Sequence, residues 1–299
     1  MNIRGIIAGI IAVCFVGGVM PSADVISDNT VITAGAVDEA EYTEGTYELV
    51  KYKNYGDHIE ISGCDRTASE VVIPSEIDGL PVTSIEEYMC CSLPVLTSLI
   101  IPDSVTSIGY GTFTHCPYLR SVIIPDSVTS IGGSVFYDTP WLENKRRENP
   151  LVIVNNILID GKTCSDNVVI PEGVTSICGL AFSGCTMLKS IKIPESVTSI
   201  GSYAFFDCSS LTSVTIPDSV TNIEYSAFFG CTSLSEIDVD INNPKYSSEN
   251  GVVFDKDKTT LLTYPSGKKG KYMIPDSVTS INFDAFFYCS SLTSVTIPD

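Results

Sequence analysis

Hydrophobic and polar positions recur along most of the chain with a period of 23 residues. An Ile-Pro pair marks the period, and most consecutive pairs lie 23 or 46 residues apart. The prolines of these pairs are Pro74, Pro102, Pro125, Pro171, Pro194, Pro217, Pro275 and Pro298. Leucine, phenylalanine and cysteine keep fixed distances from these prolines, so one structural unit is repeated and its copies are expected to stack.

The unit that runs from Leu211 to Ser233 shows what each copy builds. Apolar residues alternate with small polar residues around Val214 and Ile216, which predicts a short strand with one buried face. Pro217 has no amide hydrogen and ends the strand, and a turn follows. The stretch around Phe228 is too short for a full helix and predicts one helical turn or a 3₁₀ piece. Stacking at about 4.8 Å per coil buries apolar side chains that one copy leaves exposed.

The repeat pattern Cys-x-x-Leu-x-x-Val-x-Ile-Pro-x-x-Val-x-x-Ile-Gly-x-x-Ala-Phe is complete from Cys185 to Phe205 and nearly complete from Cys116 to Phe136. It resembles the BspA-like bacterial leucine-rich repeat family, over residues 68–299. The resemblance implies an α/β repeat solenoid, a right-handed stack of about nine coils. Short parallel strands are expected on one side of it, and short helical, 3₁₀ or irregular segments on the other. It also implies a secreted or surface-displayed protein that serves adhesion and protein interaction without catalysis.

The first residues predict export. Arg4 precedes the apolar run Ile6 to Val16, and small residues follow, so residues 1–23 are interpreted as a secretory signal peptide. Cleavage is expected after Ala23 or as late as Ala36. An uncleaved anchor and lipidation at Cys14 are the less favoured alternatives. The protein is then extracellular or at the cell surface, and it meets a membrane only through this signal or an unseen anchor.

The remaining chain divides into a linker, a cap and the solenoid. Residues 24–45 are acidic and predict a linker, and residues 46–67 predict an N-terminal capping hairpin. Residues 68–299 form the solenoid, with hairpins inserted near 150–160 and 251–264 that are expected to project from the stack. The last unit stops inside the repeat, which predicts either a fragment or a chain whose partner supplies the missing cap.

Composition argues against several functions. Seventeen Lys+Arg against thirty-six Asp+Glu leave a net charge of −19, which disfavours nucleic acid as a partner. With two histidines and no recognised catalytic or metal-binding motif, we expect no enzyme activity, no cofactor and no metal. The acidic residues that follow the prolines are expected to be solvated turn residues rather than calcium ligands. Gly161-Lys162-Thr163 resembles the end of a phosphate-binding loop but lacks its first glycine, and predicts a turn.

Eleven cysteines raise the question of disulfides. Removal of Cys14 with the signal leaves ten. Five keep one position of the repeat and are expected to be buried free thiols that pack as small apolar groups: Cys116, Cys185, Cys208, Cys231 and Cys289. The other five do not share that column: Cys64, Cys90, Cys91, Cys164 and Cys178. Among these, a bridge between Cys164 and Cys178 is the most plausible pairing.

Two surfaces are candidates for binding. Outward positions of the predicted strands carry small and basic residues: Ser98, Ser121, Lys189, Ser190, Lys192, Thr212, Ser213, Thr215, Thr293, Ser294 and Thr296. The alternative is an aromatic stripe on the outer side: Tyr203, Phe206, Tyr225 and Phe229. A protein or a host or cell-surface ligand is the expected partner, although the sequence does not identify it. The competing hypothesis is a structural spacer or scaffold that presents an additional C-terminal module not in this chain.

Overall fold

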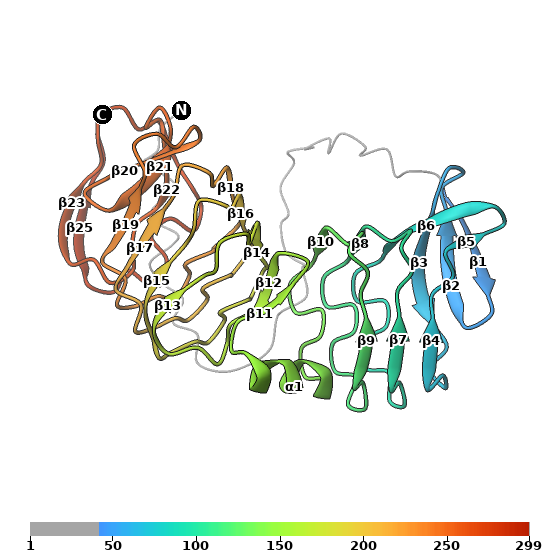
Figure 1. Cartoon of the computed structure of the whole chain (residues 1–299). Helices are drawn as coiled ribbons and strands as arrows, with labels where there is room; N and C mark the ends of the chain where they lie inside the picture. Colours follow the sequence, from blue (N-terminus) through green and yellow to red (C-terminus); the bar gives the residue numbers. More distant parts are fainter. Residues whose placement is uncertain (1–41, 299) are drawn as a thin grey trace, which may run out of the picture. The chain divides into compact units, whose positions relative to one another are not determined.

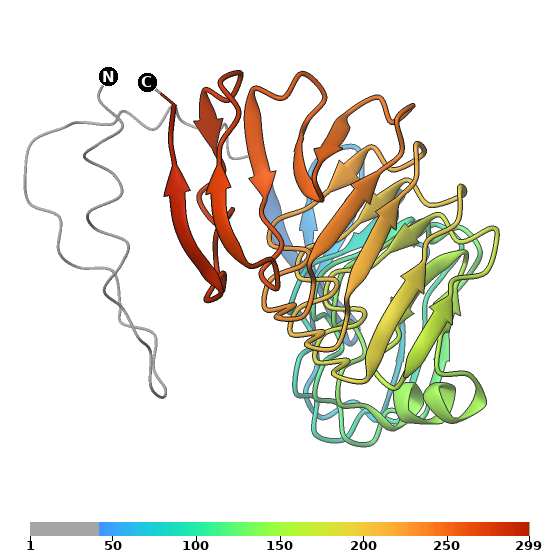
Figure 2. The ribbon, with the colours of Figure 1, turned by 90° about the vertical axis from the view of Figure 1, so that its left-hand side faces the viewer.

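The computed structural model describes residues 42–298, which form a solenoid of about ten turns (Figure 1). The expected signal peptide and residues 24–41 of the expected linker lie outside the described residues. Each regular coil contains one longer strand before the Ile-Pro pair and one two-residue strand after it. Both kinds of strand pair in parallel with their copies in the next coil, and Figure 2 shows successive strands side by side.

The longer strands form three separate sheets. Their members are β4 (Glu70–Val72), β7 (Ser98–Ile100) and β9 (Ser121–Ile123) in the first, β13 (Asp166–Val169), β15 (Leu188–Lys192), β17 (Ser213–Ile216) and β19 (Glu236–Val239) in the second, and β23 (Gly270–Met273) and β25 (Leu292–Thr296) in the third. The two breaks between these sheets coincide with the two insertions, near residues 150–160 and 251–264.

The second side of the coil also carries strands. These sheets contain β6 (Leu80–Ile85), β8 (Ser107–Ile108) and β10 (Ser130–Ile131), then β11 (Val152–Val154), β12 (Ile157–Asp160), β14 (Ser176–Ile177), β16 (Ser199–Ile200) and β18 (Asn222–Ile223), and finally β20 (Tyr246–Glu249), β21 (Val252–Asp255), β22 (Thr260–Thr263) and β24 (Ser280–Ile281). A short β5 (Glu76–Ile77) pairs with β6. Helical segments are therefore a minor part of this fold, and this side consists mainly of two-residue strands and turns.

Between the two-residue strand and the next longer strand, each coil makes a hydrogen-bonded outer turn. Tyr203 and Asp207 both have positive φ values there, 56° and 54°. The turn is held internally by Phe206 N donating to Tyr203 O at 3.0 Å, and across coils by Phe205 N donating to Ala227 O at 2.8 Å. This ladder stacks the phenylalanine column in the core, with ring centroids 5.1 Å apart for Phe182 and Phe205.

The only α-helix in residues 42–298 is α1 (Pro140–Glu148), which lies in the chain between β9 and β13. Thr139 caps it by accepting a hydrogen bond from Leu142 N at 3.2 Å, and Pro140 occupies the first turn where no amide donor is needed. Trp141 is buried against Phe136, with ring centroids 4.4 Å apart. No helix was expected in this unit from the repeat pattern.

The N-terminal cap contains three antiparallel strands rather than two. They are β1 (Thr43–Tyr47), β2 (Val50–Asn54) and β3 (Ile59–Cys64), and β3 pairs in parallel with β6. Residues 43–45, assigned to the linker from their acidity, belong to β1. Val50, Ile59 and Ile61 are buried against the first coil, so the cap covers the end of the hydrophobic core.

The prediction that the two inserted hairpins project from the stack is wrong. β11 and β12 are antiparallel, but β12 continues the parallel ladder to β14, and β22 likewise pairs in parallel with β24. Val252, Val253 and Phe254 of β21 are buried. The apolar runs that identified these hairpins are core residues, and burying them requires that the hairpins stay within the stack.

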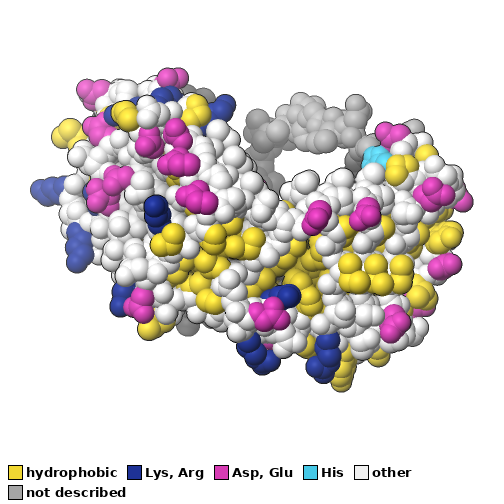
Figure 3. Space-filling view, in the orientation of Figure 1, with side chains coloured by type: hydrophobic (Ala, Val, Ile, Leu, Met, Phe, Trp, Pro, Cys, Tyr) yellow, Lys and Arg dark blue, Asp and Glu magenta, His cyan; other side chains and the backbone are white. Residues whose placement is uncertain are grey.

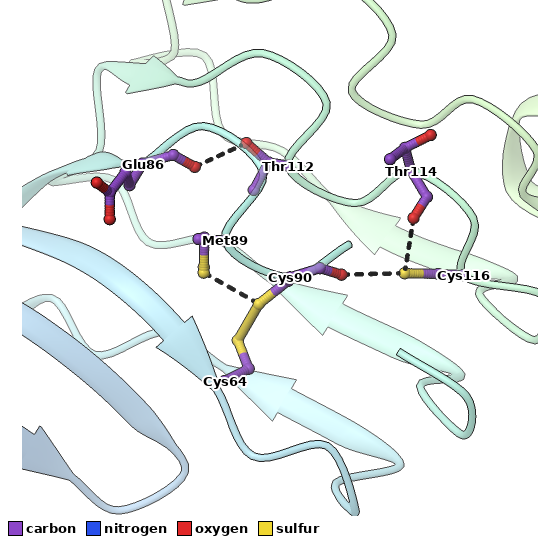
Figure 4. Close-up of a disulfide and its surroundings, with 7 residues drawn as sticks. All are labelled: Cys64, Glu86, Met89, Cys90, Thr112, Thr114 and Cys116. Carbon is purple, nitrogen blue, oxygen red and sulfur yellow. Dashed lines mark hydrogen bonds between the residues drawn. A yellow bond between two sulfur atoms is a disulfide. The ribbon is translucent and has the colours of Figure 1, made fainter. Parts of the chain in front are cut away.

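The disulfide of the described chain joins Cys64 to Cys90, with their Cα atoms 5.9 Å apart (Figure 4). Cys164 and Cys178 are free and buried, so the predicted bridge between them is wrong. Cys64, Cys90 and Cys116 follow one another at intervals of 26 residues, and Cys116 Sγ donates to Cys90 O at 3.4 Å. Cys64 and Cys90 thus extend the repeat column into the cap, at a separation that permits a bridge.

The five column thiols are free, as expected. Four are buried, and Cys289 is partly buried. Burial raises the pKa of Cys185 to about 11, and it raises that of Cys178, outside the column, to about 12. Cys185 and Cys178 are therefore neutral at pH 7 and pack as small apolar side chains.

Candidate binding surfaces

The predicted strand-face residues lie in three separate sheets. Ser98 and Ser121 are adjacent on β7 and β9. The largest group follows β15 and β17, where Ser190 pairs with Ser213 and Lys192 with Thr215. The remaining positions are Lys189 and Thr212 near this group, and Thr293, Ser294 and Thr296 on β25. Because α1 and the second insertion separate the sheets, the structure does not bring these residues into one continuous surface.

Polar contacts along the strand face involve neighbouring side chains. Lys189 Nζ lies 2.6 Å from a carboxylate oxygen of Asp166, and Ser190 Oγ donates to Asn167 Oδ1 at 2.6 Å. Both partners of the ion pair are well exposed, so its contribution to stability is small. The first sheet instead carries an exposed apolar column, Val72, Ile100 and Ile123, aligned across β4, β7 and β9. The strand face thus presents mostly short side chains and lacks aromatic anchors.

The outer turns of three coils carry seven aromatic side chains, which we call the outer aromatic cluster. Its members are Tyr203, Phe206, Tyr225, Phe229, Phe283, Phe287 and Tyr288. The first four of these residues were predicted from the sequence as an aromatic stripe. Phe283 was missed because the second insertion separates it by 58 residues from its counterpart Tyr225, which hides the repeat.

The rings form one connected network. Tyr225 stacks on Phe283 with centroids 5.2 Å apart, and Phe206 stacks on Phe229 at 5.6 Å. Phe229 also meets Tyr288 edge to face at 4.8 Å, an arrangement that suits the ring quadrupoles. Four rings remain exposed: Tyr225 42%, Phe283 62%, Phe287 39% and Tyr288 56%. The network is thus rigid at its base and open to a partner at its surface.

Carboxylates surround this cluster. Glu224 accepts hydrogen bonds from the backbone N and hydroxyl of Ser202 at 2.9 and 2.8 Å, and Asp284 accepts one from Ser226 Oγ. Burial raises the pKa of Asp207 above its ordinary value. Figure 3 shows acidic side chains scattered over the face in view, and the net charge of the chain is −19. The cluster therefore combines aromatic area with a negative rim.

Other chemistry is sparse in the described part of the chain. Within residues 42–298, no group of three or more His, Cys, Asp and Glu side chains is arranged to hold a metal ion. Over the same range, no helix has the length and apolar character needed to cross a membrane.

The stacked parallel strands, the buried Leu, Ile, Phe and Cys columns and the Ile-Pro punctuation define a leucine-rich repeat solenoid. Residues 83–157, 153–269 and 263–299 match the family described as the BspA type leucine rich repeat region, in six copies. The chain belongs to this family.

Several solved structures are similar to the chain. A leucine rich cell surface protein from Faecalibacterium prausnitzii A2-165 is 28% identical, with 85% of this chain and 76% of that chain covered and a TM-score of 0.46. The pneumococcal vaccine antigen PcpA is 21% identical, with 86% and 65% covered and a TM-score of 0.45. A leucine-rich repeat protein from Eubacterium ventriosum ATCC 27560 is 25% identical, with 84% and 58% covered and a TM-score of 0.36.

In the last two cases the chain spans less than two thirds of the similar protein. No curated protein sequence matches the chain.

Proposed function

We propose that this protein is an exported, non-catalytic binding module that contacts a protein partner through the outer aromatic cluster, in the extracellular space or at the cell surface. The observation that carries the proposal is the network of seven rings, four of them exposed, on the outer turns of three coils. Tyrosine and other large aromatic side chains dominate the energetics of protein interfaces, whereas serine and threonine contribute little.

Membership in the BspA-type repeat family supports an interaction role, because a repeat solenoid offers an extended surface on a rigid core. The apolar segment near the start of the sequence supports export. The strand face is the competing surface. Its hydroxyl and lysine side chains favour weak contacts distributed over several coils rather than one strong anchor.

The experiment compares two variants in saturation binding to immobilised cell-surface protein extract. Phe283→Ser combined with Tyr288→Ser removes exposed rings, and Ser190→Arg combined with Thr215→Arg obstructs the strand face. We expect the first variant to lose at least about tenfold in apparent affinity and the second to bind like the original chain. The reverse result would transfer the interface to the strand face. Equal binding by all three chains would favour the spacer hypothesis.

Export is tested separately by fractionation. The chain is expected in the medium or accessible to protease on intact cells, and retention in the cytoplasm would contradict this part of the proposal.

A further inference from the structure

A pocket of about 230 Å³ opens on the outer side at the first insertion. The lining residues that bear on binding are Ser134, Phe136, Ile159, Lys162, Leu180 and Ser183. One wall is the outer turn that follows β10, and the other is the outer turn that follows β14. Between them the inserted coil contributes only the short segment after β12, so the two full turns are not joined by the regular ladder.

The first wall presents unused backbone donors. In regular coils, the corresponding N–H groups donate to the next coil: Leu180 N to Ser202 O at 3.0 Å and Phe182 N to Ala204 O at 2.7 Å. At the first insertion, no residue within 42–298 accepts a hydrogen bond from the backbone N–H of Ser134 or Phe136. Phe136 is buried, and a buried N–H group is normally satisfied by water or a ligand when protein supplies no partner.

The second wall presents an unused acceptor. In the following coil, Phe206 O accepts a hydrogen bond from Gly184 N at 2.7 Å. The equivalent carbonyl, Ser183 O, receives no hydrogen bond from any residue that the structure describes. The pocket is thus bounded by amide donors on one side and a carbonyl acceptor on the other, which is the pattern that a segment of polypeptide complements.

The pocket lining holds one carboxylate, Asp160, and one ammonium, Lys162. The guanidinium of Arg146 pairs with both Asp160 and Glu143, so these four charges sum to zero. Arg146 Nε and Nη2 donate to the two oxygens of Asp160 at 2.8 and 2.6 Å, and both side chains are 9% exposed. Lys162 forms no ion pair with a described residue, and its ammonium lies 5.2 Å from the ring centroid of Tyr137. An anion would therefore meet one unpaired cation here.

We propose that this pocket binds the C-terminal residue of a peptide. The carboxylate meets Lys162 and the free N–H groups of the first wall, the peptide amide donates to Ser183 O, and an aliphatic side chain packs on Ile159 and Leu180. The volume is below the range of about 300–1,000 Å³ typical of drug-sized ligands, so a group of single-residue size fits. This site is separate from the outer aromatic cluster, and the proposal does not depend on it.

The test uses N-acetyl-leucine and N-acetyl-leucine amide as probes, titrated into the full chain and followed by calorimetry at pH 7 and low salt. We expect saturable binding of the carboxylate in the millimolar range and at least about tenfold weaker binding of the amide. Lys162→Gln should weaken carboxylate binding at least about fivefold, whereas the matched control Lys269→Gln, an exposed lysine far along the chain, should leave it unchanged.

Lys162 is exposed, so its replacement does not threaten folding, and equal melting temperatures verify this. Ser183→Phe, which fills the pocket, should abolish binding of the carboxylate. The proposal is overturned if the original chain shows no saturable binding of N-acetyl-leucine, if the amide binds equally well, or if Lys162→Gln binds like Lys269→Gln.

Discussion

The two insertions interrupt the same repeat, and the chain joins them to the preceding coil in the same way. At the first, Asn155 Nδ2 donates to Pro125 O and Val128 O at 2.6 and 3.0 Å. At the second, Asn243 Nδ2 donates to Pro217 O and Val220 O, both at 2.8 Å. One asparagine amide thus binds two carbonyls of the preceding coil. The proline oxygens also accept from Val128 N and Val220 N, whereas Val128 O and Val220 O receive no other hydrogen bond from the described residues.

The outer turns at the two insertions differ, because the side chains that face each other differ in size. At the first, Gly133 lies directly against Gly179, where a Cβ atom would overlap the carbonyl oxygen. At the second, the equivalent residues Tyr225 and Phe283 stack with centroids 5.2 Å apart. The same break in the ladder leaves a pocket where the residues are small and makes an aromatic surface where they are large. The surface that forms at an irregular coil therefore depends on a few side chains rather than on the insertion itself.

The largest expected effect is on the free energy of unfolding, and it differs between Asn243 and Asn155. Asn243 is fully buried, and its Oδ1 also accepts from Lys245 N and Tyr246 N, whereas Asn155 is partly exposed. Asn243→Ala should lower the free energy of unfolding by about 4 kcal/mol and Asn155→Ala by about 2 kcal/mol. Urea unfolding of both variants measures this difference. Equal losses would mean that the difference in burial between Asn243 and Asn155 does not affect stability.

The next effect concerns ion pairs. The Arg146–Asp160 pair at the first insertion is largely buried, and Asp160→Asn should lower the free energy of unfolding by about 3 kcal/mol. At the second insertion, Lys258 and Glu249 form an exposed pair, so Glu249→Gln should cost about 0.5 kcal/mol or less. Both are read from urea unfolding. Arg146→Met together with Asp160→Leu should recover most of the loss, and failure to recover it would argue against charge desolvation as the cause.

A third test probes the aromatic side chains. Phe229 contacts four rings, including Phe287 at 5.6 Å, whereas Tyr137 at the first insertion contacts only His115 among the described aromatic residues. Phe229→Ala should lower the free energy of unfolding by about 2 kcal/mol, and Tyr137→Ala by about 1 kcal/mol or less. Thermal and urea unfolding check both values. A larger loss for Tyr137 would contradict the view that only the second insertion is closed by aromatic packing.

The smallest effect concerns the acidic residues that follow the prolines. A hydrogen bond with Asp218, then burial, then the charges of Asp218, Asp240 and Glu172 raise the pKa of Glu195. A raised carboxyl pKa means that the folded state favours the protonated form, so this contribution is present at low pH and is lost as the pH rises through that pKa. Glu195→Gln should therefore raise the melting temperature slightly at pH 7.

This gain should shrink toward pH 4, where Glu195 itself becomes protonated. Asp103→Asn is the control, because Asp103 shares no hydrogen bond with a carboxyl group of the described residues. A lower melting temperature for Glu195→Gln at pH 7 would show that its carboxylate is stabilising and contradict the prediction.

The repeat made the stack, its core and its register predictable. Val214 and Ile216 were assigned to a buried strand face from a period of two, and both are buried in the structure. The thiol column was predicted for the same reason. In a solenoid each coil contacts mainly its neighbours, so a local pattern repeated in sequence suffices to specify packing.

The predictions that were wrong concern the segments where the 23-residue period is interrupted. The helix at Trp141, the placement of β12 and β21 inside the stack, and the Cys64–Cys90 bridge all depend on which segments become neighbours after residues are inserted. Tyr225 and Phe283 are 58 residues apart, and only the folded chain brings their rings into contact.

The sequence alone determined the family, the coil and the identity of the core columns, because those follow from a period that any stacked copy must satisfy. The tertiary structure decided the contacts at the two insertions and at the cap. These are the carbonyls that an asparagine binds, the cysteines that form a bridge, and whether an interrupted ladder leaves an open pocket or a closed aromatic surface. Such contacts depend on distances in space between residues far apart in the chain, and the repeat pattern carries no information about them where it is interrupted.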